Sequence, residues 1–418
     1  MSPPGSAAAI APATPPVPRS DAELHLFPGG TSGSEYLLEV GGDCFTVNGA
    51  LRTLIDALRE EPRSWDDLAA GYAARTGRPV SGETLRGVVA SALPANLFDP
   101  KLDQPRAMPF VISATLLPAP TVVWIAERLS WAYSRPVVCA VLVAFAATLL
   151  ALLGDVSAAL ATGPWDDGLF LVAAVMGSIL LHELGHAAAC ARYGCAPGRI
   201  GAGIYLVWPA LFTDVTRAWR LPRRRRAVVD LGGLYFQCAL VAAVGAYVLA
   251  TGSIRGLHVL ALTLLLMVHS LNPILKLDGY WLLSDLTGIR NLHDRVILTM
   301  RRVLGREPRG GSTGEDGVPE RARWVLYAYT AGMALYVAYM GYILSVLFPQ
   351  VLAAYPARAA QLGGVALQAT ARADYAAAVL AVVTLLKATV VPLVVCAMLW
   401  RTGAQVVRAR RDARLPAR

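Results

Sequence analysis

Residues 178–187 read SILLHELGHA, which places the pattern His-Glu-x-x-His inside a run of apolar residues. On a helix, residues four positions apart share a face, so His182 and His186 can bind one ion together. The carboxylate of Glu183 lies beside them, where it can take a proton from a water molecule activated by that ion. Two histidines packed in a helix bundle are the alternative, but ionisable groups at membrane depth are costly and usually functional.

The composition indicates a membrane protein. Of the 418 residues, 55% are hydrophobic and only 16% are charged, and the mean hydropathy is +0.48. These values are typical of a chain with several membrane-spanning helices. A net charge of +9 could indicate nucleic acid. The basic residues are instead distributed as membrane orientation requires, so we expect the lipid bilayer and no nucleic acid as a partner.

Six stretches are apolar and long enough to be predicted as transmembrane helices: about 136–154, 168–190, 227–250, 257–276, 324–348 and 376–400. Successive loops between these helices lie on alternate sides of the membrane, and the loops on one side carry almost all of the arginines. The positive-inside rule assigns that side and both termini to the cytosol. We therefore expect a multi-pass protein of a bacterial cell membrane. Residues 200–212 are apolar but are interrupted by glycines and a proline, which predicts a re-entrant loop or hairpin.

The chain before the first span is predicted to contain a small folded domain. Residues 1–20 are rich in proline and alanine, which is typical of a disordered tail. Residues 21–100 contain three short strand-like runs and then three helices that begin at Asn48, Ser64 and Ser81. Three strands followed by three helices predict a winged-helix-like α+β domain.

The rest of the chain is predicted as a linker, a membrane domain and a tail. Residues 101–135 are interrupted by prolines and are predicted as an interfacial linker, with an amphipathic helix over about 122–131. The spans form an α-helical polytopic domain over 136–400, and residues 401–418 are a basic cytosolic tail. The six cysteines lack Cys-x-x-Cys spacing and lie mostly in apolar runs, which indicates small buried side chains and no zinc ribbon or disulfide framework.

A catalytic zinc site needs three protein ligands and an open position for water, so two histidines are insufficient. Residues 272–281 read NPILKLDGYW. The predicted topology brings Asp278 to the depth of the two histidines, because all three lie near the cytosolic ends of their helices. Pro273 breaks the helix, and Gly279 frees the backbone so that the carboxylate can turn inward.

The combination of HELGH on one span and NP followed by LDG on a later span resembles the site-2 protease family of intramembrane zinc metalloproteases, and most closely its peptide zinc metalloprotease branch. Further likeness lies in YLVWPALFTDVT at residues 205–216 and in AWRLP at 218–222. The resemblance covers residues 170–290 well. One departure is Gly232-Gly233, which stands where Gly-Pro is expected.

This resemblance implies one Zn²⁺ per chain, bound by His182, His186 and Asp278, with Glu183 as the catalytic base and acid. Asn272 matches an asparagine of the family motif and is expected to hold the substrate backbone or the oxyanion. In the re-entrant segment, Gly203 and Tyr205 are expected to receive an extended substrate by strand addition.

Four weaker candidates lie around this motif. His269 could line the site, but a hydrogen-bonded packing role is favoured. Asp230 is predicted to pair with an arginine of the run 223–226, and Asp214 is predicted to cap or orient the re-entrant segment rather than to bind metal. The arginine run itself is predicted as a lipid-headgroup and topology patch.

Residues 36–99 resemble the PqqD-like family of peptide-recognition domains, on the pattern YLLEVGGDCFTVNGALRTLIDAL and then SWDDLAAGYA. The resemblance implies that residues 21–100 capture the leader of a ribosomally synthesised precursor peptide. Another packing or regulatory role is the alternative for this domain.

The predicted function is therefore hydrolysis of a peptide bond in a precursor peptide by an intramembrane zinc metalloprotease. One alternative keeps the enzyme but makes a single-span membrane protein its substrate. The other alternative is a metal-stabilised membrane protein without catalysis, which exports a peptide or confers immunity to it. No oligomeric state is predicted.

Overall fold

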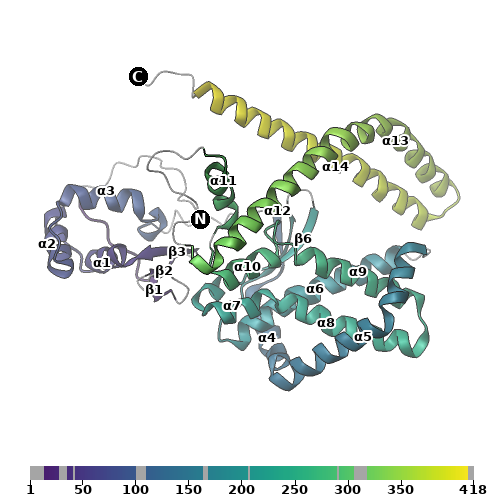
Figure 1. Ribbon diagram of the computed structural model, residues 1–418, viewed down its shortest axis with the longest axis horizontal. Helices are drawn as coiled ribbons and strands as arrows, with labels where there is room; N and C mark the ends of the chain where they lie inside the picture. The colour runs from purple at the N-terminus through teal and green to yellow at the C-terminus, as the bar shows by residue number, and fades with distance from the viewer. Residues whose placement is uncertain are drawn as a thin grey trace. The chain divides into compact units, whose positions relative to one another are not determined.

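The computed structural model describes residues 14–27, 35–40, 43–99, 110–162, 168–205, 208–289, 291–305 and 318–412 (Figure 1). The chain is mainly helical, with two small sheets. It divides into two compact units. The first contains Met1–Gly203 and Ala210–Thr330, and the second contains Ile204–Pro209 and Ala331–Arg418.

The N-terminal domain has the predicted order of three strands and three helices. Its antiparallel sheet has the order β1-β2-β3, and Leu38 lies opposite Leu24 on one side and Phe45 on the other. The strands are β1 (Glu23–Leu26), β2 (Glu35–Val40) and β3 (Asp43–Asn48), and the helices are α1 (Gly49–Leu58), α2 (Trp65–Thr76) and α3 (Gly82–Ala92).

The helices of this domain begin where the sequence predicts. Asn48, Ser64 and Ser81 each accept a hydrogen bond from the main-chain N–H three residues later, which satisfies a donor that the helix leaves unpaired. The apolar faces then close a single core, whose fully buried members include Leu38, Leu54, Ile55, Leu58, Leu68 and Leu97.

The folded domain begins earlier than predicted. Pro15 and Pro18 are buried, and the main-chain N–H of Arg19 donates to the Leu97 carbonyl at 3.0 Å. The prediction of a disordered tail over residues 1–20 is therefore wrong for its last residues, from about residue 15, because the two prolines pack on the domain. Residues 1–13 of that tail lie outside the described residues.

Four helical segments are long and apolar enough to cross a membrane, namely Arg135–Ala161, Gly168–Arg192, Gly232–Thr251 and Glu320–Ala371. They lie in α5 (Arg135–Thr162), α6 (Gly168–Arg192), α8 (Gly232–Thr251) and the run from η5 (Glu320–Ala322) through α12 (Arg323–Tyr342) and η6 (Ile343–Leu347) to α13 (Phe348–Ala371). These helices indicate a membrane protein with four candidate spans.

The other two predicted spans correspond to shorter apolar segments. The stretch 257–276 contains α9 (Ile254–Ser270), and the stretch 376–400 lies within α14 (Tyr375–Asp412), whose shorter apolar part is Ala377–Val390. The count of six therefore stays a prediction. In the second unit, α13 packs against α14, where the Tyr355 hydroxyl lies 2.8 Å from Thr389 Oγ1. The predicted tail 401–418 is helical as far as Asp412, and residues 413–418 lie outside the described part.

The predicted re-entrant segment forms a β-hairpin. Its strands β5 (Ile200–Tyr205) and β6 (Trp208–Thr213) belong to a sheet of order β4-β5-β6. The strand β4 (Phe110–Leu117) comes from the predicted linker 101–135, whose sequence was expected to contribute only a helix. That helix is also present, as α4 (Ala119–Leu129).

The remaining helices connect these elements and position the site. The chain leaves α9 at Ser270, and Asn272 Oδ1 accepts a hydrogen bond from the Ile274 N–H at 2.9 Å in a tight turn. A Cβ on Gly279 would collide with the Leu271 carbonyl, so only glycine allows the start of α10 to pack this closely against the end of α9. The other elements are α7 (Arg223–Asp230), α10 (Asp278–Thr287), α11 (Leu292–Val303), and the short turns η1 (Ala95–Leu97), η3 (Ser130–Tyr133) and η4 (Thr216–Arg220).

Candidate metal centre

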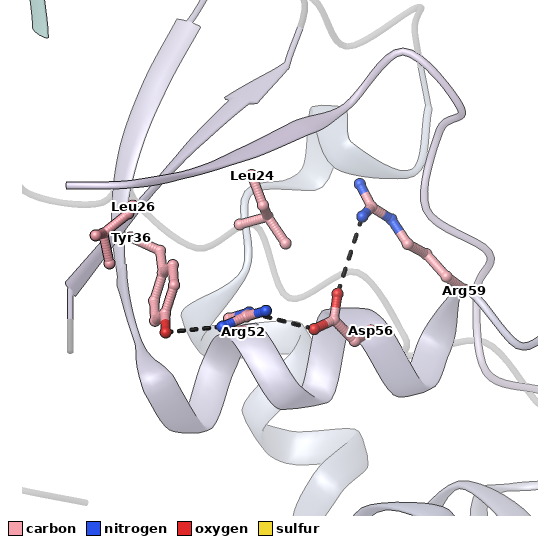
Figure 2. Close-up of a pocket in the computed structure, with 6 residues that line it drawn as sticks. All are labelled: Leu24, Leu26, Tyr36, Arg52, Asp56 and Arg59. Atoms are coloured by element: carbon pink, nitrogen blue, oxygen red, sulfur yellow. Dashed lines mark hydrogen bonds and ion pairs between the residues drawn. The ribbon is translucent and has the colours of Figure 1, made fainter. Parts of the chain in front are cut away.

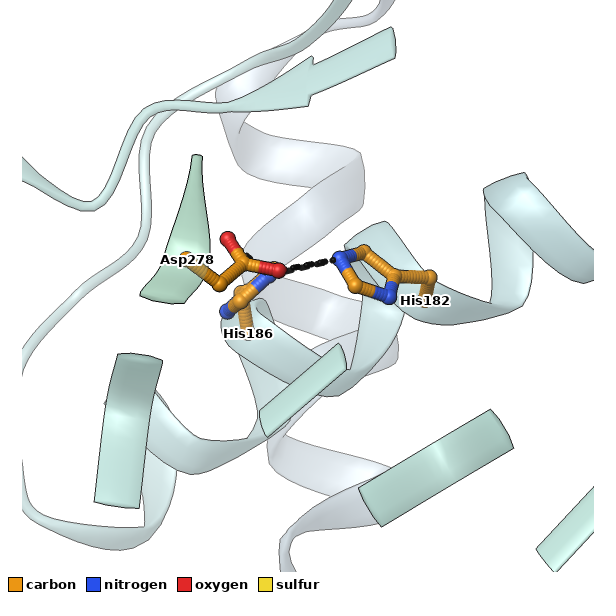
Figure 3. A group of neighbouring side chains, drawn as sticks. All are labelled: His182, His186 and Asp278. Atoms are coloured by element: carbon orange, nitrogen blue, oxygen red, sulfur yellow. Dashed lines mark hydrogen bonds and ion pairs between the residues drawn. The ribbon is translucent and has the colours of Figure 1, made fainter. Parts of the chain in front are cut away.

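The structure brings together the three predicted metal ligands. His182 and His186 come from one face of α6, and Asp278 is the first residue of α10. Their ligand atoms all lie within 4.8 Å of one another, and Figure 3 shows the rings and the carboxylate converging. Asp278 Oδ2 is 2.9 Å from His182 Nε2, and Asp278 Oδ1 is 3.5 Å from His186 Nε2.

The outer nitrogen of each imidazole has a hydrogen-bond acceptor. His182 Nδ1 lies 3.0 Å from Gln237 Oε1, and His186 Nδ1 lies 2.7 Å from the Val229 carbonyl oxygen. Gln237 Nε2 donates to Ser178 Oγ at 3.1 Å, which orients the amide so that its oxygen faces the ring. Each Nδ1 therefore carries the hydrogen, and each Nε2 presents a lone pair to the centre.

The donor set fits a divalent cation. The two Nε2 atoms face each other at 3.1 Å, so two lone pairs would repel unless a cation lay between them and Asp278. Asp278 Oδ2 is buried and faces His182 Nε2 at 2.9 Å, a nitrogen that has no hydrogen to donate in this tautomer. Two neutral imidazoles and one carboxylate are a common ligand set for transition metals, with a position left for water.

Close backbone packing makes this geometry possible. A Cβ on Gly185 would collide with the Gly232 carbonyl, and one on Gly233 would collide with the His182 ring. The Tyr133 hydroxyl lies 2.8 Å from the Gly185 carbonyl oxygen and 3.3 Å from that of Gly232, so it holds both helices at their crossing. The Gly232-Gly233 pair, which departs from the expected Gly-Pro, therefore gives His182 the room it needs.

The predicted base lies beside the ligands and is held by a residue that sequence reasoning missed. Glu183 is buried, with 7% of its surface exposed. Thr213 Oγ1, at the end of β6, lies 2.7 Å from Glu183 Oε2 and 2.9 Å from the Glu183 main-chain oxygen. The only sequence signal for Thr213 is its place in the motif YLVWPALFTDVT.

Of the predicted substrate-binding residues, Asn272 lies in the turn that leads to the ligand-bearing helix α10. The carboxamide oxygen of Asn272 is used in the turn before α10, which leaves its NH₂ group for another acceptor. Gly203 and Tyr205 lie on β5, and the side chain of Tyr205 lies outside the described part of the structure. His269 is exposed at the end of α9 and does not belong to the ligand group.

Two predictions about charged residues have opposite outcomes. Asp214 caps the turn after the hairpin as predicted, because its Oδ1 accepts hydrogen bonds from the Thr216 N–H at 3.1 Å and from the Thr216 hydroxyl at 2.5 Å. The predicted pairing of Asp230 with a neighbouring arginine is wrong. Within the described residues Asp230 Oδ2 is buried without a hydrogen bond, and the buried Arg226 bonds Asp285 instead.

Arg226, the last residue of the arginine run 223–226, forms a buried ion pair with Asp285. Arg226 Nε and Nη2 donate to the two carboxylate oxygens of Asp285 at 2.8 and 2.5 Å, and both side chains are buried. The pair joins α7 to α10, the helix that begins with Asp278. Arg226 therefore supports the helix that carries Asp278, and it is not part of the predicted lipid-headgroup patch.

The sheet of the N-terminal domain contacts the segment beside the metal centre. Arg220 of η4 donates to Glu39 Oε2 through Nε at 2.8 Å, and its Nη2 lies 3.0 Å from Glu23 Oε2. Next to it, Trp219 lies between Phe27, with ring centroids 6.3 Å apart, and Trp281, with ring centroids 6.0 Å apart. Trp281 is one helical turn from Asp278, so this contact connects the domain to a ligand-bearing helix.

The N-terminal domain carries a pocket between β1 and α1 (Figure 2). Arg52 lies over the Tyr36 ring, 4.5 Å from its centroid, and donates to the Tyr36 hydroxyl at 2.8 Å. Leu26 is 61% exposed on β1, which is an edge strand in this sheet order. The lining residues are Leu24, Leu26, Tyr36, Arg52, Asp56 and Arg59.

The six cysteines are free. Cys190, Cys195 and Cys238 are buried as predicted, whereas the prediction of buried side chains is wrong for Cys139 and Cys396, which are exposed, and for Cys44, which is only partly buried. The Sγ atoms of Cys190 and Cys195 lie 2.8 Å apart at the end of α6.

No protein-family model, no curated protein and no solved structure matches the chain. The function is therefore inferred from the geometry of the site.

Proposed function

We propose that this chain is a zinc metalloprotease similar to site-2 proteases, which hydrolyses a peptide bond at the His182–His186–Asp278 centre. The observation that carries the proposal is the pair of Nε2 atoms that face each other beside the buried carboxylate of Asp278. When bound, zinc supplies Lewis acidity towards the scissile carbonyl and towards water.

In this proposal Glu183 moves the proton. Its carboxylate takes a proton from the attacking water and later returns it to the nitrogen of the leaving amine. Two observations support this role: Glu183 follows His182 directly on α6, and it is buried, which limits the access of bulk water to its carboxylate. The amide NH₂ of Asn272 is a candidate donor to the oxygen of the scissile carbonyl.

The substrate must present an extended backbone, because the carbonyl groups of a helix are already hydrogen-bonded. We propose that the hairpin of β5 and β6, around Gly203 and Tyr205, receives this backbone as an added strand. The edge strand β1 and the adjoining pocket support capture of a precursor peptide by the N-terminal domain. This route is supported by the contact of Arg220 with the N-terminal domain, which belongs to the same compact unit as the three candidate ligands.

Co-expression with candidate precursor peptides tests the proposal, with mass spectrometry of the products. Glu183→Gln should lower the rate of cleavage at least ~100-fold, as removal of a general base does. Glu127→Gln, on the exposed face of α4, is the matched control and should leave the rate unchanged. Cleavage by Glu183→Gln at the wild-type rate would rule out the mechanism.

The two alternatives predict different results. If the substrate is a single-span membrane protein, Leu26→Asp in the pocket should leave its cleavage intact, whereas processing of a captured precursor should fail. If the protein is a metal-stabilised exporter or immunity protein, its phenotype should survive Glu183→Gln and be lost with His182→Ala. Metal binding alone does not require the carboxylate of Glu183, so its presence favours the enzyme.

A further inference from the structure

Thr213 makes the one side-chain hydrogen bond to Glu183 within the described residues. Its Oγ1 lies 2.7 Å from Glu183 Oε2, and the separation in sequence is 30 residues. The same oxygen lies 2.9 Å from the Glu183 main-chain carbonyl. A threonine hydroxyl has one hydrogen, and a charged carboxylate is the stronger acceptor, so the hydrogen points to Oε2.

The base of the hairpin fixes the position of Thr213. The Asp214 N–H donates to the Arg199 carbonyl at 3.0 Å, and the Gly198 N–H donates to the Asp214 carbonyl at 2.7 Å. A Cβ on Gly198 would lie 2.7 Å from Asp214 Oδ2, so this close pairing requires glycine. These hydrogen bonds fix the end of β6, where Thr213 contacts Glu183. The Thr213 hydroxyl is therefore oriented before any substrate binds.

We propose that Thr213 is a positioning residue that assigns different roles to the two oxygens of Glu183. The hydroxyl of Thr213 holds Oε2, which stops rotation of the carboxylate and leaves Oε1 for proton transfer. Oε1 takes the proton from the attacking water, and the same proton passes to the leaving amine, while the Thr213 hydrogen stays in place. This inference rests on the proposed protease function, because it gives Thr213 a role only through Glu183.

The test compares Thr213→Val, which keeps the shape but removes the hydroxyl, with Thr213→Ser, which keeps the hydroxyl. The matched control is Thr148→Val in α5, where the lost hydrogen bond goes to the Ala144 carbonyl of the same helix at 2.9 Å. Cleavage is measured on a quenched-fluorescence library of unstructured synthetic peptides. Metal content and melting temperature are measured on the same full-length proteins.

We expect Thr213→Val to lower kcat about 10- to 100-fold, a part of the ~10²- to 10⁴-fold that a positioned acid–base group contributes. KM, zinc content and melting temperature should stay within twofold, or within the error, of the wild type. Thr213→Ser should recover most of the rate, and Thr148→Val should show no loss. Equal losses in the Val and Ser variants, or loss of zinc from Thr213→Val, would overturn the proposal.

A second readout does not depend on activity. The infrared difference between the wild type and Glu183→Gln isolates the carboxylate band of Glu183, and this band should shift in Thr213→Val but not in Thr213→Ser. An unshifted band would contradict the hydrogen bond. If Glu183→Gln is inactive while Thr213→Val retains the full rate, the role of Thr213 fails and the protease function stands. If Glu183→Gln is fully active, the protease function itself fails.

Discussion

The imidazole of His182 packs directly against the bare Cα of Gly233, so that a methyl group at this position would collide with the ring. This contact joins α6, which carries two candidate ligands, to the beginning of α8. It places the ring where Gln237, one turn later on α8, can accept its Nδ1 hydrogen. The tight helix crossing and the orientation of the ligand therefore depend on each other.

Gly233→Ala is expected to abolish metal binding, because the added methyl group must displace His182. The matched control is Gly177→Ala on α6, where a Cβ would have nothing within 4 Å. That control should be neutral or stabilising by up to ~1 kcal/mol, since alanine favours a helix interior. Zinc content after purification in a zinc-containing buffer checks both variants, and a fully loaded Gly233→Ala protein would contradict the interpretation.

Gln237→Leu is expected to weaken metal affinity about 10- to 100-fold, which is the usual effect of losing the partner of a metal-bound histidine. The amide oxygen fixes the His182 tautomer, and the leucine would also leave Ser178 without its donor. Gln237→Glu keeps an acceptor at this position and should retain most of the affinity. Competition with a chromogenic chelator measures both, and equal affinity of the wild type and Gln237→Leu would refute the role of Gln237.

Removal of the metal should destabilise the protein. A ligand that binds only the folded state adds about 2.7 kcal/mol at a free concentration 100 times its Kd. Melting in detergent with and without a chelator should therefore show a lower melting temperature after chelation. In His186→Ala the chelator should have no effect, and a similar shift in this variant would place the stabilising ion elsewhere.

Local signals in the sequence predict much of this structure. The spacing of His182 and His186 follows from helix periodicity, and the caps at Asn48 and Ser64 follow from side-chain chemistry within three residues. Pro273 and Gly279 mark a break before Asp278, which the structure has as a turn and a new helix. Each of these inferences needs only neighbouring residues.

The supporting contacts could not be predicted in this way. Gln237 is 55 residues from His182, and Arg199 is 84 residues from Thr115, to which it donates between β5 and β4. Such pairs depend on how whole elements pack, and no period or short motif encodes them. The same reason applies to Arg226. Its arginine neighbours predicted a lipid-headgroup ligand, whereas the fold pairs it with the distant Asp285.

Arg226→Ala is expected to destabilise the protein by about 3–5 kcal/mol, because it leaves the buried carboxylate of Asp285 without a counter-charge. The double variant Arg226→Met/Asp285→Leu removes both charges and should recover most of this loss. Chemical denaturation in detergent measures the free energy of unfolding. A double variant as unstable as Arg226→Ala would show that packing, and not the unpaired charge, causes the loss.

Arg220→Glu is expected to loosen the N-terminal sheet from the segment beside the metal centre, because it places like charges against Glu39 and Glu23. Hydrogen exchange of residues 35–48 should become faster, by an amount that corresponds to about 0.5–1 kcal/mol for a partly exposed contact. The charge swap Arg220→Glu/Glu39→Arg should restore protection, and the exposed Arg224→Ala should have no effect.

The same contact should depend on pH in a defined direction. A hydrogen bond from His25 and the charge of Arg220 lower the pKa of Glu23 below its ordinary 4.5. A carboxyl group with a lowered pKa in the folded state stabilises it fully above the unfolded value, and this contribution disappears as the pH falls through the folded value. Protection of β1 and β2 should therefore be constant from pH 7 to about 5 and decline below 4.5, and Glu23→Gln should remove part of that decline. A decline of the same size in the wild type and in Glu23→Gln would contradict this role of Glu23.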